Sequence, residues 1–149
     1  MICFRLATED DVPAVAALLG DDVLGATREH REMHTYTTAF RRMQAEGSNH
    51  LIVGVEADGS VVATYQITFI SGLSLRAARR AQVEAVRVAS ALRGQGIGAA
   101  LMADAEARAR AAGCSLIQLT TNRTRTDAHR FYERLGFTPS HIGYKRELT

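Results

Sequence analysis

The chain has 149 residues, 46% of them hydrophobic and 23% charged, with a net charge of +2. These values are typical of one folded domain with one core, and they argue against a disordered or nucleic-acid-binding chain. No stretch approaches the roughly 18 apolar residues of a membrane-spanning helix and no signal peptide opens the chain, so we expect a cytoplasmic protein that binds neither membrane nor nucleic acid.

The first third of the chain predicts one strand and two helices. The strand covers Ile2–Leu6, where apolar residues alternate. Thr8 to Asp11 resembles a capping box, and the helix that follows ends at Gly20, after which 21–25 are expected to form a loop. Arg28–Ala45 predicts a second helix. One face of it carries an apolar stripe that either packs into the core or lines a substrate cleft, formed by Met33, Tyr36, Thr37, Phe40 and Met43.

The middle third predicts an antiparallel meander. Asn49–Glu56 and Val61–Ile70 are rich in β-branched residues, and an Asp-Gly pair separates them, which is a strong hairpin signal. Arg80–Val88 is a third strand of the same kind, after a loop over Gly72–Arg79.

The last third alternates helix and strand. A helical pattern runs from Ile97 to Ala112, and a short strand at Ser115–Thr120 follows, parallel to the strand before the helix. Asp127–Leu135 predicts another helix, and Ile142–Leu148 a final strand. The fold class is therefore α/β, of the α+β kind, with one mixed sheet and helices on its faces.

The two cysteines, Cys3 and Cys114, are isolated from each other and from other metal-ligating residues. They form neither a disulfide framework nor a zinc pattern, and we expect reduced, buried thiols that lie in strands. No cluster of residues predicts a metal site.

The sharpest local feature is the turn Arg93-Gly-Gln-Gly-Ile-Gly98, between a strand and a helix. Glycines allow close backbone approach, and a helix N-terminus offers unpaired N–H groups, so this turn predicts a phosphate cradle rather than a simple tight turn. The Gly-Lys-Ser/Thr of a P-loop is absent. Gly94, Gly96 and Ala99 also fit the dinucleotide fingerprint, but the region around the end of the next strand, Ile117–Asn122, lacks the acidic residue that an NAD site needs.

Two segments together resemble the GCN5-related N-acetyltransferase (GNAT) superfamily. Val86–Met102 is similar to that family's acetyl-CoA motif, Arg/Gln-x-x-Gly-x-Gly/Ala at the start of a helix. Ala128–Phe137 is similar to its C-terminal Ala-x-x-Phe-Tyr-x-x-x-Gly-Phe segment. The two motifs occur in the family's order and at about its spacing, so the resemblance covers most of the chain.

The resemblance implies one GNAT-type domain over residues 1–149. Its mixed, mostly antiparallel sheet would have about six to seven strands, splayed between the fourth and fifth, with about four flanking helices. It implies acetyl-CoA as cosubstrate and no metal. The expected coenzyme-binding residues are Val86, Arg87, Val88, Arg93, Gly94, Gln95, Gly96, Ile97, Gly98, Ala99, Asn122, Arg125 and Tyr132.

One of these positions departs from the family pattern. The position seven before Tyr132, often Asn in relatives, is Arg125 here, so Asn122 or nearby backbone would replace that contact. Arg123, Arg125 and Arg130 form a basic group, one or more of which would meet the coenzyme's 3′-phosphate or simply face solvent.

The same resemblance assigns the acid and the base. Tyr132 would protonate the departing thiolate, because a phenol with a pKa of about 10 is protonated at pH 7. Glu84 would accept the amine proton directly or through water, or else face solvent or pair with Arg80 or Arg87. His141 is a second candidate for the base, whereas His129 is expected to pack or face solvent.

The expected activity is acetyl transfer from acetyl-CoA to a primary amine, either a peptide or a small molecule, by direct attack on the thioester. The alternatives are a non-catalytic acyl-CoA-binding or regulatory module of the same fold and, more weakly, an NAD-binding oxidoreductase. A homodimer is expected by resemblance. A cationic acceptor would be favoured if the acidic residues around the first two helices faced it, namely Asp21, Asp22, Glu29, Glu32 and Glu46.

Overall fold

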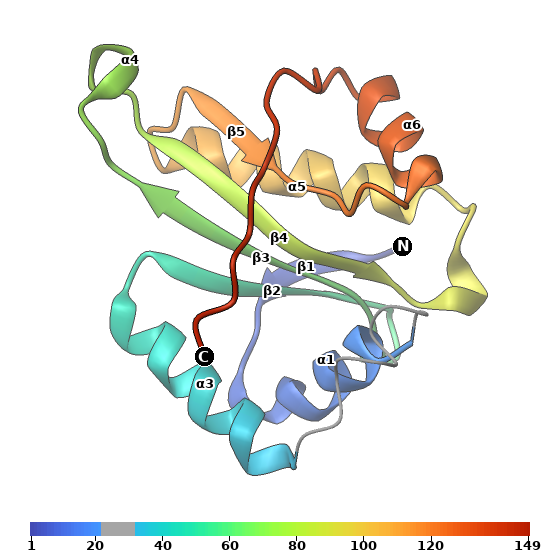
Figure 1. Cartoon of the computed structure of the whole chain (residues 1–149). Coiled ribbons are helices and arrows are strands. Elements are labelled where there is room, and N and C mark those ends of the chain that lie inside the picture. Colours follow the sequence, from blue (N-terminus) through green and yellow to red (C-terminus); the bar gives the residue numbers. More distant parts are fainter. Residues whose placement is uncertain (22–31) are drawn as a thin grey trace. The chain divides into compact units, whose positions relative to one another are not determined.

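The computed structural model of the protein describes residues 1–21 and 32–149. These residues form two compact units, 1–118 and 119–149, each of which is described by itself (Figure 1). Part of the predicted loop over 21–25 and the first residues of the second helix lie outside the described residues.

Within the described residues, five strands form one sheet in the order β1-β2-β3-β4-β5. β1 (Cys3–Leu6), β2 (Asn49–Val55), β3 (Val61–Ile70) and β4 (Arg80–Val88) are antiparallel neighbours, which confirms the predicted meander and its hairpin. β5 (Leu116–Leu119) lies beside β4 and runs parallel to it, as predicted. The Gln118 amide donates to the Gln82 side chain across this pair at 2.7 Å.

The β3–β4 ladder contains a bulge. Gln66 lies opposite Glu84, but Thr64 lies opposite Arg87, so β4 has one residue more than β3 between these two pairs. Ala85 adopts φ +52° at this point, a conformation that is rare for a residue with a Cβ. The bulge lies between the predicted base and the predicted coenzyme-binding stretch of β4.

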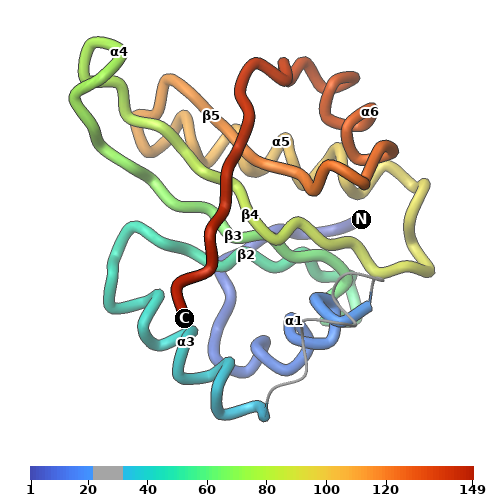
Figure 2. The backbone as a smooth tube through the Cα atoms, in the orientation of Figure 1, coloured from blue at the N-terminus to red at the C-terminus, as the bar shows by residue number. Residues whose placement is uncertain are grey.

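Helices cover both faces of the sheet in the first unit (Figure 2). α1 (Val12–Leu19) and α3 (Met33–Glu46) pack on one face, and α5 (Ile97–Ala111) packs on the other. Successive side chains of β3 point to opposite faces of the sheet. Thr64 faces α1 and α3, whereas the Tyr65 hydroxyl donates to Asp104 of α5 at 2.5 Å. The core lies in these two layers and includes the fully buried Ile52, Tyr65, Ile67 and Leu101.

The start of α1 confirms the capping box. A 3-10 turn, η1 (Glu9–Asp11), precedes the helix, and the Asp11 carboxylate accepts the backbone N–H of Thr8 at 2.7 Å. The same carboxylate accepts two hydrogen bonds from the Arg5 guanidinium, at 2.7 and 3.0 Å. The hydrogen bonds from Arg5 are the main reason that the pKa of Asp11 lies below its usual value, since burial acts in the opposite direction.

Two short helical turns lie in connections between the longer elements. η2 (Ser90–Leu92) follows β4, and α4 (Ser74–Ala77) lies inside the loop predicted between β3 and β4. Three consecutive residues from Leu75 to Ala77 have positive φ, so α4 is a single left-handed turn. With α4 counted, the described residues contain five α-helical segments rather than about four.

The second unit holds α6 (Thr126–Arg134), close to the predicted helix. The predicted strand over Ile142–Leu148 is wrong: residues 138–149 form no strand, and the sheet has five strands rather than six or seven. A strand requires a neighbour that accepts and donates backbone hydrogen bonds, and no such bond engages residues 141–149 within the described part of the chain. Ile142, Tyr144 and Leu148 are 72%, 90% and 94% exposed.

The cysteines differ from expectation in burial. Cys3 lies in β1 but is exposed, and Cys114 is half-buried just before β5 rather than within it. Among the described residues, no helix combines the length and the apolar character that crossing a membrane requires.

Candidate active site

The glycine-rich turn lies at the N-terminus of the 15-residue helix α5. Gly94 and Gly96 adopt φ +82° and +81°, which glycine reaches at little cost. A Cβ placed on either residue would meet no atom within 4 Å, so the space above both is open to a ligand. The turn therefore places two glycines in the left-handed conformation with open space above them, which leaves room for a ligand close to the backbone.

The backbone N–H groups from Gly94 to Ala99 complete this cradle. None of them donates a hydrogen bond to another described residue, and the first helical hydrogen bond of α5 is donated by the Ala100 N–H. Unpaired N–H groups and the positive end of the helix dipole favour an anion at this position. A pyrophosphate therefore fits the residues present, and these N–H groups would hold it.

The end of β4 lies next to this turn. Arg93 donates from Nε to the Val88 carbonyl oxygen at 3.4 Å, which ties the turn to the strand. β5 starts beside Arg79, where the Ser115 N–H donates to the Arg79 carbonyl, and it is only four residues long. A parallel strand of that length ends near Val83, so β5 does not reach the backbone edge of Val86–Val88.

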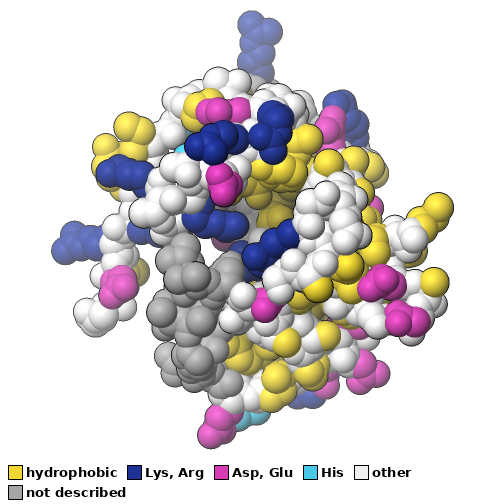
Figure 3. Space-filling model, turned by 90° about the vertical axis from the view of Figure 1, so that its right-hand side faces the viewer, with side chains coloured by type: hydrophobic (Ala, Val, Ile, Leu, Met, Phe, Trp, Pro, Cys, Tyr) yellow, Lys and Arg dark blue, Asp and Glu magenta, His cyan; other side chains and the backbone are white. Residues whose placement is uncertain are grey.

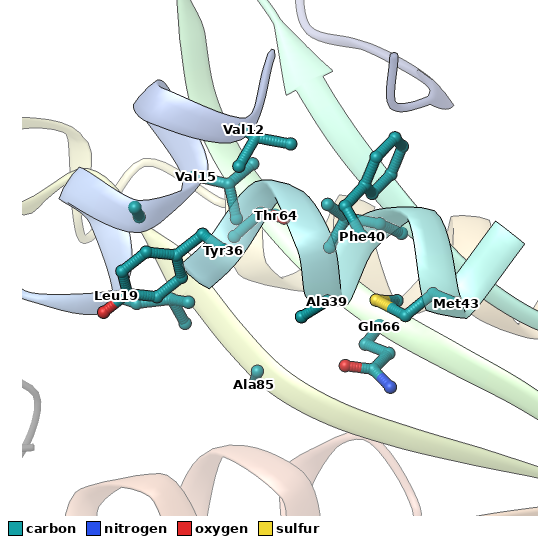
Figure 4. Close-up of a pocket in the computed structure, with 12 residues that line it drawn as sticks. Val12, Val15, Leu19, Tyr36, Ala39, Phe40, Met43, Thr64, Gln66 and Ala85 are labelled. Atoms are coloured by element: carbon teal, nitrogen blue, oxygen red, sulfur yellow. The ribbon is translucent and has the colours of Figure 1, made fainter. Parts of the chain in front are cut away.

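A pocket of about 110 Å³ opens on the other face of the sheet, between α1, α3 and the middle of β3 and β4 (Figure 4). Val15 and Leu19 of α1, and Tyr36, Phe40 and Met43 of α3, supply most of its wall. Thr64, Gln66 and the bulge residue Ala85 form its floor. Three residues of the predicted stripe, Tyr36, Phe40 and Met43, line this pocket, and Phe40 is also a core residue.

Glu84 lies beside this pocket. It pairs with Gln66 in the β3–β4 ladder, and directly opposite residues of an antiparallel pair point to the same face. The side chain is exposed, and within the described part of the chain its carboxylate forms no ion pair with Arg80 or Arg87. The Arg87 guanidinium instead donates from Nη1 to the Val86 carbonyl at 3.0 Å.

Tyr132 belongs to the second unit and lies on α6. Its ring is half-buried and packs edge-on against Phe131 and Phe137, with ring centroids 5.0 and 5.8 Å apart. The Phe-Tyr-x-x-x-Gly-Phe spacing thus builds a small aromatic cluster that fixes the orientation of the phenol ring.

Three of the other polar candidates of the second unit have partners within it. The Asn122 side-chain oxygen accepts hydrogen bonds from the backbone and the hydroxyl of Thr124, at 3.0 and 2.7 Å, so it shapes the turn before α6. His129 contacts the Asn122 carbonyl oxygen through Nε2 at 2.9 Å, as expected for a packing role. Arg125 is exposed at the start of α6, and His141 is exposed and contacts the Ser140 hydroxyl.

The remaining charged candidates are dispersed. Arg130 pairs with Asp127 at 3.1 Å on the α6 surface. Three of the acidic residues have other partners: Asp21 accepts from the Ser90 N–H, Glu46 accepts from Asn49, and Glu32 pairs with His34. None of these three carboxylates lines the pocket. Asp22 and Glu29 lie outside the described residues. Basic and acidic side chains occur together on the face drawn in Figure 3. Across the described residues, no group of three His, Cys, Asp or Glu side chains is placed to hold a metal.

Sequence reasoning missed the floor of the pocket. Gln66 and Thr64 occupy alternate positions of an apolar strand, where polar residues ordinarily indicate a solvent-facing side. The structure instead places both residues at the floor of the pocket, where Thr64 is buried. The only indication in the sequence was a polar residue between apolar neighbours. That pattern is the same for a residue that lines a pocket and for a residue that faces solvent.

Comparison with known proteins agrees with this geometry. The family model for the acetyltransferase (GNAT) family matches residues 14–137. A crystal structure of a transcriptional regulator from Bacillus halodurans C-125 is 43% identical and covers 99% of this chain and 100% of its own, with a TM-score of 0.94. A protein of Agrobacterium tumefaciens strain C58, described as an acetyltransferase, is 27% identical over 98% of this chain and 99% of its own, with a TM-score of 0.87.

One curated relative matches part of the chain. The aminoalkylphosphonate N-acetyltransferase of Salmonella typhimurium strain LT2 is 45% identical over 67 residues. That match spans 45% of this chain and 44% of the relative, so less than half of the relative's length is matched. The expectation of an NAD-binding oxidoreductase is not supported by any of these matches. The family match covers most of the chain, from the first helix to the Gly-Phe after α6, and the chain therefore belongs to the acetyltransferase (GNAT) family, whose members transfer acetyl groups from acetyl-CoA.

Proposed function

We propose that the protein transfers the acetyl group of acetyl-CoA to a primary amine. The observation that carries this proposal is the run of unpaired N–H groups from Gly94 to Ala99, open to solvent at the start of α5. The family match runs through the boundary between the two units, which supports the proposal that residues 1–149 work as one catalytic domain.

In this proposal the coenzyme lies along the free edge of β4. Backbone groups of Val86–Val88, which β5 does not reach, would pair with the pantetheine arm, and an N–H of this edge would stabilise the oxyanion. The amine nitrogen attacks the thioester carbonyl carbon, so that a C–N bond forms as the C–S bond breaks. Glu84 accepts the proton that the amine loses, and Tyr132 donates a proton to the departing thiolate.

Thermal unfolding with acetyl-CoA, with NADH and ATP as controls, tests the binding step. A ligand at 100 times its dissociation constant stabilises the folded state by about 2.7 kcal/mol. Release of free thiol from acetyl-CoA in the presence of primary amines then tests catalysis. The name of the Salmonella relative makes aminoalkylphosphonates one acceptor class for that screen.

A second candidate is a regulatory module that binds acyl-CoA without turnover. The name of the Bacillus halodurans protein favours it, since that structure covers nearly the whole chain. Stabilisation by acetyl-CoA without thiol release from any amine would support this alternative.

We further propose a homodimer. Ile142, Tyr144 and Leu148 are large apolar side chains that are exposed, and a second copy would cover them. Sedimentation of the full chain should give the mass of a dimer, and Ile142→Ser combined with Leu148→Ser should shift it towards the monomer. A wild-type monomer at high concentration would contradict this proposal.

A further inference from the structure

We propose that the pocket between α1, α3 and the sheet is the acceptor site, and that it selects a primary amine with an apolar carbon chain. The Gln66 side-chain oxygen and the Glu84 carboxylate would hold the ammonium group. The inference rests on the proposed acetyltransferase activity and specifies its acceptor.

The orientation of the Gln66 amide follows from its neighbours. A carboxylate only accepts hydrogen bonds, so the Glu46 carboxylate, 3.0 Å from Asn49, must face the Asn49 NH₂ group. The Asn49 oxygen is then turned to Gln66 and accepts from the Gln66 Nε2 at 2.8 Å. This chain of hydrogen bonds leaves the Gln66 Oε1 pointing away from Asn49, on the side of Ala85 (Figure 4).

The Thr68 hydroxyl strengthens this arrangement. It also donates to the Asn49 oxygen, at 3.2 Å, so two donors converge on one acceptor and oppose a flip of the Asn49 amide. Gln66 therefore offers the pocket a fixed hydrogen-bond acceptor rather than a donor.

Glu84 supplies a second acceptor on the same face, because it lies opposite Gln66 in the ladder. A primary ammonium group has three N–H donors, and a carbonyl oxygen and a carboxylate can take two of them. The pocket also reaches Ala85, the residue before Val86–Val88, where the thioester is proposed to lie. An amine held by Gln66 and Glu84 would therefore be next to the bond that it attacks.

The walls determine the rest of the acceptor. They come from Val12, Val15, Leu19, Phe40 and Met43, and no Lys, Arg or His lies among the described residues that line the pocket. A cavity of roughly 150 Å³ with such walls accommodates benzene. The 110 Å³ pocket therefore fits a short aliphatic chain, and none of the described residues that line it offers a cation to an anionic end such as a phosphonate. Arg87 lies on the same face, opposite Thr64, but does not line the pocket.

A comparison of acceptors tests this selectivity. We expect n-propylamine and n-butylamine to give kcat/KM at least tenfold higher than 2-aminoethylphosphonate in thiol release from acetyl-CoA. A preference for 2-aminoethylphosphonate would overturn the proposed substrate class.

Substitutions test the role of Gln66. Gln66→Leu keeps the approximate volume but removes the acceptor oxygen, and it should raise the KM for n-butylamine on the order of tenfold, as expected for a lost hydrogen bond to a charged group. The KM for acetyl-CoA should not change. Gln82→Leu is the matched control, because Gln82 lies on the same face, bonds to Gln118 and does not line the pocket.

Asn49→Leu provides a second variant that leaves the pocket lining intact. It removes the partner that orients Gln66, so it should raise the KM for the amine less than Gln66→Leu does. An unchanged amine KM in both variants would overturn the assignment of Gln66. Absence of thiol release from the wild type with every amine would instead refute the proposed activity, and acetyl-CoA stabilisation separates these two failures.

Discussion

Gly96→Ala distinguishes a ligand cradle from a turn that merely needs glycine. Gly96 has φ +81°, and an added Cβ would meet nothing within 4 Å, so the cost to the free protein is conformational strain alone. A left-handed conformation costs a residue with a Cβ about 1–2 kcal/mol. For a domain of this size, that lowers the Tm by roughly 2–8 °C. In the bound state, however, the same Cβ would occupy the space proposed for the pyrophosphate.

Gly113→Ala is the control at the other end of α5. Gly113 has φ +80° and the same open surroundings, so it carries equal strain but lies away from the proposed site. Both variants should lose similar stability when thermal unfolding is followed by circular dichroism. Acetyl-CoA at 100 times the wild-type Kd should then raise the Tm of the wild type and of Gly113→Ala by roughly 5–11 °C.

The same acetyl-CoA concentration should raise the Tm of Gly96→Ala little or not at all. If Gly96→Ala instead responds to acetyl-CoA as fully as Gly113→Ala does, the glycine at this position serves the turn only. The argument that the open space above the turn receives the coenzyme would then be refuted.

Three further predictions concern other parts of the molecule. Tyr132→Phe should lower kcat by about 10²–10⁴ while the Tm shift with acetyl-CoA persists; an unchanged kcat would remove Tyr132 from the proposed acid role. Asp11→Asn should cost about 1–2 kcal/mol of unfolding free energy in urea at pH 7, because Arg5 loses its carboxylate partner. The lowered pKa of Asp11 means that this difference is present above pH 3.8, its usual pKa, and disappears as the pH falls further through the folded-state pKa; a difference that grows in acid would contradict the assignment. Tyr65→Phe should cost about 1–2 kcal/mol, since the Asp104 carboxylate loses a buried donor, and an unchanged urea midpoint would show that Arg108 alone satisfies it.

The elements with strong local signals could be predicted from the sequence. The Asp-Gly turn, the capping box at Thr8 and the glycine that ends α1 each specify a local conformation with few alternatives. The order of strands and helices followed from these signals because short connections keep successive elements adjacent.

The C-terminal strand could not be predicted in the same way. Ile142, Tyr144 and Leu148 alternate as strand residues do, but alternation reports only side-chain polarity and not the presence of a hydrogen-bonding neighbour. The acceptor pocket was missed for a related reason. The orientation of Gln66 depends on Asn49 and Glu46, and only the strand register and the approach of α3 bring these three together.

The extra residue in β4 determines which single-residue deletion the strand can accept. Ala81 and Val83 face α5, and beyond the bulge this face is taken by Val86 and Val88, so the inward residues change from odd to even positions. Deleting Ala85 would restore a continuous two-residue repeat without turning any of these four side chains around. Ala85 therefore behaves as an inserted residue with respect to the core. Deleting it would keep these four side chains on the α5 face and would remove the bulge beside the pocket.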